Sequence, residues 1–450
     1  MKTKNTRENT VKISPKMWDE FSRSMLSKRA NNEELMGFLL CDRQKTRANK
    51  NRYIVKGWIV PDADCYEYQS QAGLSLKQEF NHYLLQQYVA EQKLDVVHIH
   101  THPGEQQPRF SAVDNFHESQ YAKFLTATFS NKPQLISGVF NESLTHSCFR
   151  QWANDGKISE DVGFSNGWFD RVTENSDTYK LEPIFTRQEV FGKGVQQQLG
   201  ELEIALIGCG GIGSIFTETL ARLGVKKWTL IDPDVLETVN LNRMPGATKT
   251  MVERGWTKVH YAKKLIKKVY PTGSYVREIA ESIESERAQK AIAKADLIVV
   301  ATDNHLSRQI AQETALSSNI PLVCLGTHID ILENNVPRMY CRVTVPPLGG
   351  GWCLMCGNVI SSQKAALESA PVQISDAMVQ KGYLPDIGDP AVFWLNGICA
   401  SKGVGVIHSM VSGFLKIDRG IDWIYDFANG NWLKADVDSL LKDNCYFCGS

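Results

Sequence analysis

The sequence has no net charge, no apolar run of membrane-spanning length and no apolar segment at its start. Fifty Lys and Arg residues balance fifty Asp and Glu residues, so no overall positive field favours nucleic acid or an anionic membrane as a partner. The apolar runs have the length of buried strands, well below the roughly 20 residues of a membrane helix. The first eleven residues are polar and lack the apolar core of a secretory signal, so we expect a cytoplasmic protein without a membrane partner.

Disulfides are not expected either. The chain has eleven cysteines, an odd number, and four of them form two Cys-x-x-Cys pairs, Cys353/Cys356 and Cys445/Cys448. In a cytoplasmic chain this pattern favours metal binding. Four thiolates suit a closed, tetrahedral structural zinc, and the alternative is that the thiols are redox-active or merely buried.

Length and composition are those of two or three globular domains, with 450 residues of which 42% are hydrophobic and 22% charged. The sequence has no internal repeat and no low-complexity tract. Residues 1–155 predict a mixed α+β domain, with helices over 15–28, 74–92 and 111–124 and strands over 36–41, 53–60 and 94–102. A polar stretch over 156–184 predicts a linker.

Residues 185–450 predict a second, Rossmann-like domain. A strand over 202–207, a helix over 214–223 and a strand over 228–231 form a β-α-β unit, and short buried strands over 295–301 and 321–325 continue the pattern. Buried strands that alternate with helices are typical of a doubly wound, mostly parallel sheet. The predicted fold class is therefore α/β.

Three residues of the first domain have the spacing of a metal site. His100 and His102 are two apart in a predicted strand, so both imidazoles project from one face and can bind one ion. Asp114, in the first turn of the next predicted helix, can supply the third ligand. Three protein ligands leave a position open for water, and zinc lowers the pKa of that water from about 15.7 to about 7. A hydroxide is then available at neutral pH for hydrolysis.

Two further residues can supply what a zinc hydrolase needs besides its metal. Glu34, just before a predicted strand, can act as general base and acid, and Ser111 can present its hydroxyl to the oxyanion. Most of residues 1–155 resembles the JAMM/MPN metalloprotease family, many of whose members are deubiquitinases. The resemblance rests on Glu34-x-x-Gly37, His100-x-His102-Pro103 and Ser111-x-x-Asp114.

Each part of this set has an alternative. Ser111 and Asp114 have the spacing of a helix cap, a role that is compatible with catalysis. His98 shares the strand face of the two histidines and is a rival ligand. Glu33 is a rival of Glu34, because a slip of one residue would exchange them.

A glycine-rich turn marks the second domain. Gly208, Gly210, Gly211 and Gly213 lie between a predicted strand and a predicted helix, in a Gly-x-Gly-x-x-Gly pattern. Asp232 comes nineteen residues after Gly213, at the end of the next strand, where an acid can bind ribose hydroxyls. These signals alone predict a dinucleotide, although tight glycine turns also occur for packing reasons.

Further motifs change that prediction to ATP. With the glycine turn, they resemble the ThiF/MoeB-like activating enzymes, the superfamily of the ubiquitin-activating enzymes, over about residues 185–450. Those enzymes bind ATP and Mg²⁺ and adenylate the C-terminal glycine of a ubiquitin-like protein. The motifs are Asn240-Leu241-Asn242-Arg243, Gly255-x-x-Lys258, Ala301-Thr302-Asp303-Asn304 and Thr186-Arg187-Gln188.

The resemblance implies a role for each motif residue. Arg243 and Lys258 would contact phosphates, where negative charge concentrates when a carboxylate attacks the α-phosphorus. Asn240 would orient the phosphates, Asp303 would engage Mg²⁺ and Asp232 would hold the ribose. By the same resemblance, Arg187 reaches into a partner subunit's site, which implies a homodimer, and the paired Cys-x-x-Cys motifs form a zinc knuckle.

One expected residue is missing. Full ubiquitin-activating enzymes carry a nucleophilic cysteine in a crossover loop, but no cysteine lies between Gly357 and Ile398. Cys399 follows in a predicted buried helix, Cys209 lies in the glycine turn and Cys324 on a predicted buried strand. We therefore expect an acyl-adenylate that passes directly to an acceptor, such as the nucleophile of a conjugating enzyme or a sulfur donor.

The two predicted chemistries act on one carboxyl terminus in opposite directions. The sequence predicts a hydrolase that trims a ubiquitin-like protein or removes it from targets, fused to an enzyme that adenylates it. A conjugating-enzyme homologue encoded beside the gene would favour protein modification, in bacterial antiphage defence. One alternative is a carrier that donates sulfur for cofactor or cysteine synthesis. Another is a first domain that serves as a docking module with an inactive site, and a peptide-modifying adenylating enzyme is more distant.

Overall fold

The computed structural model describes residues 9–29, 32–46, 49–169, 179–331, 337–369, 390–415, 417–441 and 444–449. The chain forms two compact units, Met1–Asp170 and Arg171–Ser450. The boundary falls inside the range 156–184 that was predicted as a linker. The first unit extends into that range, because residues Ile158–Ser165 form a strand with buried side chains such as Val162, and this strand pairs with the strand before it.

The first unit is built on a closed barrel in the strand order β1-β3-β2-β6-β7-β8-β9. The barrel closes where β1 pairs in parallel with β9. Helix α1 (Pro15–Ser27) begins at Ser14, whose hydroxyl accepts the Met17 amide hydrogen at 3.3 Å. The strands are β1 (Asn9–Lys12), β2 (Met36–Lys45), β3 (Asn51–Ile59), β6 (Asp95–His102), β7 (Leu135–Asn141), β8 (Ser147–Trp152) and β9 (Ile158–Ser165).

The helix predicted over 74–92 is wrong in its first part. Leu74 and Leu76 alternate with Ser75, and this period of two makes Gly73–Leu76 a strand, β5, which pairs with β4 (Tyr66–Ser70). Helix α2 (Gln78–Leu84) follows and continues as a π-helical segment, η2 (Leu85–Glu91). Helix α3 (Ala112–Thr128) comes after β6 and carries the predicted third metal ligand.

The second unit contains an eight-stranded sheet in the order β12-β11-β10-β13-β14-β15-β16-β17. The first five strands are parallel and the last three pair antiparallel, so the prediction of a mixed α/β fold with a parallel sheet is confirmed. The strands are β10 (Glu203–Ile207), β11 (Lys227–Ile231), β12 (Tyr275–Ile279), β13 (Leu297–Val300), β14 (Leu322–Ile331), β15 (Pro337–Val345), β16 (Ile421–Asp426) and β17 (Asn431–Lys434).

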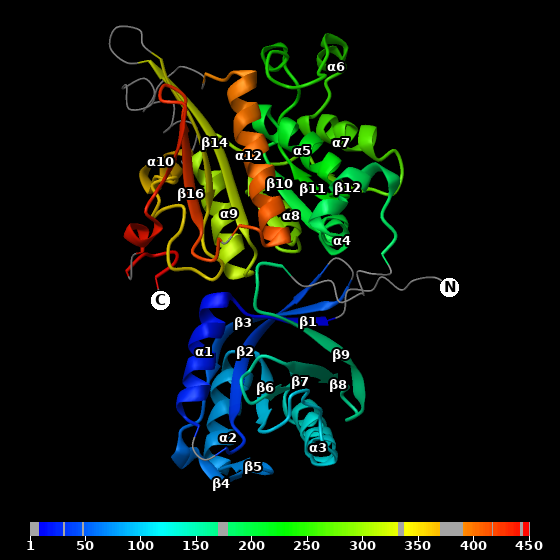
Figure 1. Ribbon diagram of the computed structural model, residues 1–450, viewed down its shortest axis with the longest axis vertical. Coiled ribbons are helices and arrows are strands. Elements are labelled where there is room, and N and C mark those ends of the chain that lie inside the picture. The colour runs from blue at the N-terminus through cyan, green and yellow to red at the C-terminus, as the bar shows by residue number, and fades with distance from the viewer. Residues whose placement is uncertain are drawn as a thin grey trace. The chain divides into compact units, whose positions relative to one another are not determined.

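Helices cover both faces of this sheet (Figure 1). One face packs against α8 (Glu286–Ile292) and α9 (His305–Ser317), with α10 (Ser362–Glu368) beside α9, and the other against α5 (Gly211–Leu223), α7 (Lys258–Val269) and α12 (Phe393–Ser412). The remaining pieces are short: η1 (Ala63–Cys65), η3 (Pro183–Phe191), α4 (Lys193–Glu201), η4 (Thr238–Asn240), α6 (Lys249–Glu253) and η6 (Val437–Leu440). In chain order, the parallel strands lie 3-2-1-4-5, so the order reverses between β10 and β13, where such sheets bind ligands.

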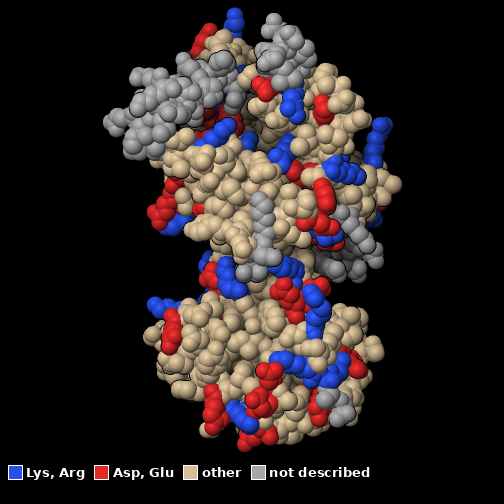
Figure 2. Space-filling view, turned by 90° about the vertical axis from the view of Figure 1, so that its left-hand side faces the viewer, with Lys and Arg blue, Asp and Glu red and all other residues tan. Residues whose placement is uncertain are grey.

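The surface carries charges of both signs. On the face seen in Figure 2, Lys and Arg side chains are interspersed with Asp and Glu side chains in each unit. Within the described ranges, every helix is too short or too polar to span a bilayer.

Candidate functional site

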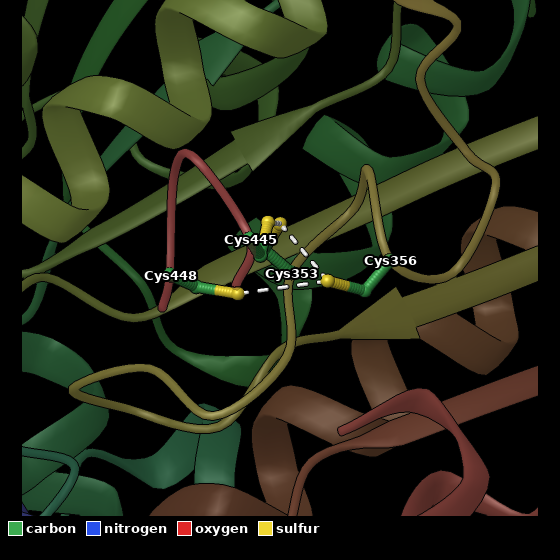
Figure 3. A group of neighbouring side chains, drawn as sticks. All are labelled: Cys353, Cys356, Cys445 and Cys448. Atoms are coloured by element: carbon green, nitrogen blue, oxygen red, sulfur yellow. Dashed lines mark hydrogen bonds between the residues drawn. The ribbon is translucent and has the colours of Figure 1, made fainter. Parts of the chain in front are cut away.

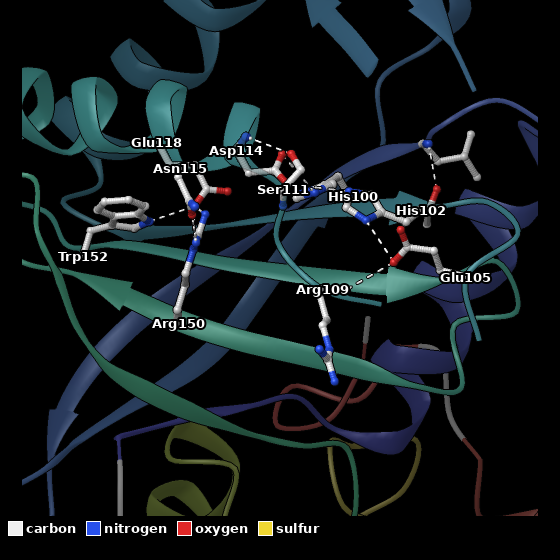
Figure 4. Close-up of polar contacts among 12 residues, drawn as sticks. His100, His102, Glu105, Arg109, Ser111, Asp114, Asn115, Glu118, Arg150 and Trp152 are labelled. Atoms are coloured by element: carbon white, nitrogen blue, oxygen red, sulfur yellow. Dashed lines mark hydrogen bonds and ion pairs between the residues drawn. The ribbon is translucent and has the colours of Figure 1, made fainter. Parts of the chain in front are cut away.

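The structure brings His100, His102 and Asp114 together in the first unit (Figure 4). One ligand atom from each lies within 4.8 Å of the others. Nε2 of His100 is 3.4 Å from one carboxylate oxygen of Asp114, and Nε2 of His102 is 3.7 Å from the other. Nε2 of His100 is also buried without a hydrogen-bond partner among the described residues. Two imidazole nitrogens and a carboxylate that converge in this way fit a zinc ion.

The cap of α3 places the carboxylate of this cluster. Ser111 Oγ accepts the Asp114 amide hydrogen at 3.1 Å, and Asp114 Oδ2 accepts the Ser111 amide hydrogen at 2.6 Å. Burial alone would raise the pKa of Asp114, but the His100 side chain 3.4 Å away and the hydrogen bonds with Ser111 lower it well below its usual range. The capping residues predicted as the alternative and the predicted metal ligand are therefore the same pair of residues.

A partly buried network ties α3 to the barrel (Figure 4). Arg150 on β8 donates to Glu118 at 3.0 and 2.6 Å and to Asn115 at 2.5 Å, and both acceptors lie on α3. The indole of Trp152 donates to the same Glu118 oxygen at 2.7 Å. Because the Arg150 side chain is only 5% exposed, these bonds fix the helix that begins beside Asp114.

Glu34 is the acid that the structure brings near this cluster. Burial raises its pKa to about 7, His100 opposes that rise, and the charges of Asp114 and Glu105 add to it. A carboxyl group with such a pKa can both accept and release a proton near neutral pH. Glu105 lies on the far side of His102, with its carboxylate 3.5 Å from Nδ1. That contact leaves Nε2 of His102 facing Asp114.

His98, the rival ligand, lies outside the cluster. Its ring packs 5.0 Å from the rings of both Phe38 and Tyr121, centroid to centroid. Burial lowers its pKa to about 3, so the ring is neutral. His98 is therefore a buried, neutral residue that packs against aromatic side chains.

The four paired cysteines form a second cluster (Figure 3). Sγ of Cys353 lies 3.8 Å from Sγ of both Cys356 and Cys445, and Cys356 lies 3.6 Å from Cys448. Hydrogen bonding from Cys448 lowers the pKa of the Cys353 thiol to about 5. Four thiols from two segments that are about ninety residues apart fit a tetrahedral Zn²⁺ that would tie the C-terminal segment to the sheet.

A cavity of about 300 Å³ opens where the strand order of the second unit reverses. Its wall includes most of the predicted nucleotide residues, which come from five separate segments: Gly208, Gly210, Gly211, Asp232, Asn240, Arg243, Lys258 and Asp303. The glycines follow β10 and Asp303 follows β13, so the two sides of the cavity are the carboxyl ends of neighbouring parallel strands.

The carboxylate of Asp232 fixes the glycine turn. It accepts the Cys209 amide hydrogen at 2.7 Å and the Asp234 amide hydrogen at 2.9 Å. Burial raises its pKa, and the nearby Lys258 opposes that rise. Lys258 forms an ion pair with Asp234 at 2.7 Å. Burial alone would lower the Lys258 pKa, but the carboxylates of Asp232, Asp234 and Asp303 together raise it, so the ammonium stays charged.

Two other predicted residues are held by local bonds. Asn240 is buried and its side chain accepts the Glu237 amide hydrogen at 3.0 Å. The guanidinium of Arg243 donates to the Val239 carbonyl oxygen at 2.7 Å. Both side chains therefore keep their place at the cavity wall without a ligand.

Two predicted residues lie elsewhere. Arg187, on η3, is exposed and does not line the cavity. Gly213 lies one turn into α5, where its backbone packs against the carbonyl of Gly208. Its role is therefore close packing between turn and helix.

The glycine turn gives a matched pair of substitutions. A Cβ at Gly213 would fall inside contact distance of the Gly208 carbonyl oxygen, whereas a Cβ at Gly210 would meet nothing within 4 Å. We expect Gly213→Ala to lower the free energy of unfolding of this unit by about 2 kcal/mol or more, because backbone must move. Gly210→Ala should unfold like the wild type in a chemical denaturation. Equal stability of the two variants would contradict this account of the turn.

Several residues of the cavity wall were missed. Asp234 follows Asp232 by two positions, and its place at the carboxyl end of β11 was a usable signal. Arg308 on α9 donates to the Thr302 and Val359 carbonyl oxygens at 2.9 and 3.3 Å, and Asn396 on α12 accepts from the Thr327 hydroxyl at 3.2 Å. Both line the cavity from helices whose apolar pattern gives no hint of it.

Comparison with known proteins assigns part of the second unit. The sequence model of the ThiF family matches residues 185–379. The second unit contains a ThiF-type domain. Over 203 residues, which are 43% of this chain and 59% of the relative, the chain is 29% identical to the sulfur carrier protein ThiS adenylyltransferase of Bacillus subtilis. Over 124 residues, which are 28% of this chain and 32% of the relative, it is 32% identical to a probable molybdopterin-synthase adenylyltransferase of Porphyra purpurea.

Among solved structures, the chain is similar to Escherichia coli MccB crystallised with MccA-N7isoASN, at 18% identity and a TM-score of 0.49. That similarity covers 61% of this chain and 77% of the MccB chain. The ThiF-type domain matches less than two thirds of the length of each of the two curated relatives.

Proposed function

We propose that the ThiF-type domain adenylates the C-terminal carboxyl group of a ubiquitin-like or sulfur-carrier protein, with ATP and Mg²⁺. The main support is the cavity at the reversal of strand order, which gathers the glycine turn, three acids and three cations from segments that are far apart in sequence. Relatives of this domain are named as adenylyltransferases of ThiS and of molybdopterin synthase.

The polar residues of the cavity fit the proposed ligands. ATP, when bound, supplies the adenylyl group and the pyrophosphate that leaves. The N-terminus of α5 would present amide hydrogens to phosphate. Lys258 and Arg243 stabilise negative charge on the phosphates, and Asp232 accepts hydrogen bonds from the ribose. Asp303, which lines the same cavity, would hold Mg²⁺.

We further propose that the first unit is a JAMM/MPN-type zinc hydrolase. The support is the convergence of His100, His102 and Asp114, together with the buried Nε2 of His100 that lacks a hydrogen-bond partner among the described residues. Zinc, when bound, supplies a water molecule that ionises near neutral pH. Glu34 would take up that proton and deliver it to the leaving amine. The Ser111 oxygen accepts the Asp114 amide hydrogen, which leaves its own hydroxyl hydrogen available to the oxyanion.

The two proposed activities act on the same chemical group, the C-terminal carboxyl of the carrier. Hydrolysis after a terminal glycine exposes a carboxylate, and adenylation activates the same carboxylate. The acyl-adenylate then passes directly to an acceptor, since the cysteines of the second unit outside the zinc cluster are buried. Burial raises the pKa of the Cys209 and Cys324 thiols, and hydrogen bonding with Cys341, followed by burial, raises that of Cys399.

A homodimer would complete the adenylation site with Arg187. The short helix that carries Arg187 also exposes apolar side chains, including Val190 at 85% and Phe191 at 46%. Phe191 packs on His408, which also contacts the 61% exposed Phe414. An exposed apolar cluster of this kind is typical of a protein interface. If two copies associate through this surface, Arg187 of one copy would lie at the interface, where it could reach the cavity of the other copy.

The acceptor decides between two versions of this function. A conjugating enzyme that receives the carrier would produce an isopeptide adduct on a target protein. A sulfur donor would produce a thiocarboxylate on the carrier, and the name of the Bacillus subtilis relative favours this version. Mass spectrometry of the carrier after incubation with ATP and cell extract distinguishes the two products.

Pyrophosphate exchange tests the adenylation. The chain is incubated with ATP, labelled pyrophosphate and purified ThiS, ubiquitin or a ubiquitin-like protein encoded beside its gene. We expect label to enter ATP only when a carrier with a free C-terminal glycine is present. Absence of exchange with every one of these carriers would contradict the proposal.

Zinc content tests both metal sites. We expect about two zinc ions per chain, with one lost in His102→Ala and the other in Cys356→Ser. Cys356→Ser should also lower the unfolding temperature of the second unit, because that zinc joins two distant segments. A single zinc that survives His102→Ala would leave the first unit as a docking module without a metal.

A further inference from the structure

The run Glu34 to Met36 is held by strand β4 at two of its three residues. The Glu34 amide donates to the Ser70 carbonyl oxygen at 2.8 Å, and the Gln69 side chain donates to the Glu34 carbonyl oxygen at 2.7 Å. The Met36 amide donates to the Tyr66 hydroxyl at 3.2 Å. These bonds fix the run against β4, but they do not set its distance from the two histidines on β6.

Leu35, the middle residue of this run, is tied to β6 by Thr101. Strands β2 and β6 are antiparallel, with Met36 opposite His100. One step further the Thr101 amide donates to the Leu35 carbonyl oxygen at 3.0 Å, as the ladder requires. The return bond differs: the Leu35 amide donates to the Thr101 hydroxyl oxygen at 2.9 Å. A side-chain oxygen thus takes the place of the backbone acceptor where β2 leaves the ladder.

This bond acts on the position of Glu34. Glu34 comes two residues before Met36, which is paired with His100, and the register continued by two residues would bring Glu34 level with His102 on the same face. Thr101 itself points to the other face, because it alternates with His100 and His102 along β6. Its side chain is fully buried, and its hydroxyl oxygen accepts the Leu35 amide hydrogen.

We propose that Thr101 is a positioning residue of the hydrolase, whose hydroxyl holds the Leu35 amide and thereby sets the Glu34 carboxyl against the two histidine ligands. The inference rests on the proposed hydrolase function. A general base must lie within hydrogen-bond reach of the proton it takes, and displacement of about 1 Å costs on the order of 100-fold in rate. Loss of the rung at Leu35 frees the neighbouring Glu34 to move by such a distance.

Two substitutions at one position separate the hydroxyl from the shape of the side chain. Thr101→Val keeps the volume but removes the acceptor, and Thr101→Ser keeps the acceptor. Thr126→Val is a matched control on α3, since it removes a hydroxyl that donates to the Ala122 carbonyl oxygen at 3.0 Å, far along the helix from Asp114. Each protein is measured for zinc content and for hydrolysis of a peptide ending in Gly-Gly-aminomethylcoumarin. Amide exchange of the segment around Leu35 is followed by mass spectrometry.

We expect Thr101→Val to lower kcat about 10–100-fold, with KM and zinc content unchanged and with faster exchange at Leu35. Thr101→Ser and Thr126→Val should behave like the wild type. Wild-type kcat in Thr101→Val would overturn the inference and leave the hydrolase proposal intact. So would loss of zinc in Thr101→Val, or equal losses of kcat in the Val and Ser variants, because Thr101 would then be structural. A zinc-loaded wild type that does not cleave the peptide contradicts the hydrolase itself, and the inference falls with it.

Discussion

Asp303→Asn is expected to reduce carrier-dependent pyrophosphate exchange by about 10²–10³-fold. Asp303 lies just after β13, on the cavity wall opposite the glycine turn, where its carboxylate adds to the negative field that raises the Lys258 pKa. The amide is nearly the same size but carries no charge, so it is a poor ligand for Mg²⁺. The fold should be unaffected, because the side chain is at the surface of the cavity.

A control on the next helix isolates the effect of position. Glu313→Gln removes a carboxylate from the exposed side of α9, where it accepts only from Gln309 at 2.9 Å among the described side chains. That variant should exchange at the wild-type rate. Full exchange in Asp303→Asn would refute the assignment of this cavity as the adenylation site.

Glu34→Gln is expected to lower hydrolysis of the Gly-Gly-aminomethylcoumarin peptide by about 10²–10⁴-fold while zinc content stays at about two per chain. The reason is that the amide cannot accept the proton of the zinc-bound water. The charges of His100 and Asp114 act on the pKa of the Glu34 carboxyl group. Replacing this group with an amide therefore removes a proton acceptor beside the three predicted metal ligands and leaves those ligands in place.

Glu33→Gln is the matched control, because it removes the same charge one position earlier in the chain. It should cleave the peptide like the wild type. If Glu33→Gln loses activity and Glu34→Gln does not, the alternative left open by the sequence is the correct one. If neither loses activity, the first unit does not use a carboxyl base at this position.

Local spacing explains why much of the candidate chemistry could be predicted from the sequence. The period of two puts both histidines on one strand face. The capping pattern marks the acid at the helix start, and the glycine pattern marks the turn between strand and helix. The structure places these residues where the patterns predict them. The alternation of short apolar strands with helices likewise predicted the parallel sheet of the second unit. Their functional roles stay predictions.

Long-range packing explains what could not be predicted. Arg308 and Asn396 reach the cavity because α9 and α12 pack on opposite faces of the sheet beside β14. No local pattern marks such residues. Near residue 74 the apolar residues fit both a helix and a short strand. The strand forms because this segment pairs with β4, which local sequence does not show.

Pyrophosphate exchange with two forms of one carrier connects the two units most directly. One form ends at its terminal glycine, and the other continues beyond it by a short extension. The wild type should activate both forms, since the hydrolase exposes the glycine of the extended one, whereas His102→Ala should activate only the mature form. Equal exchange of the extended form by His102→Ala and the wild type would contradict the claim that both sites act on one carboxyl terminus.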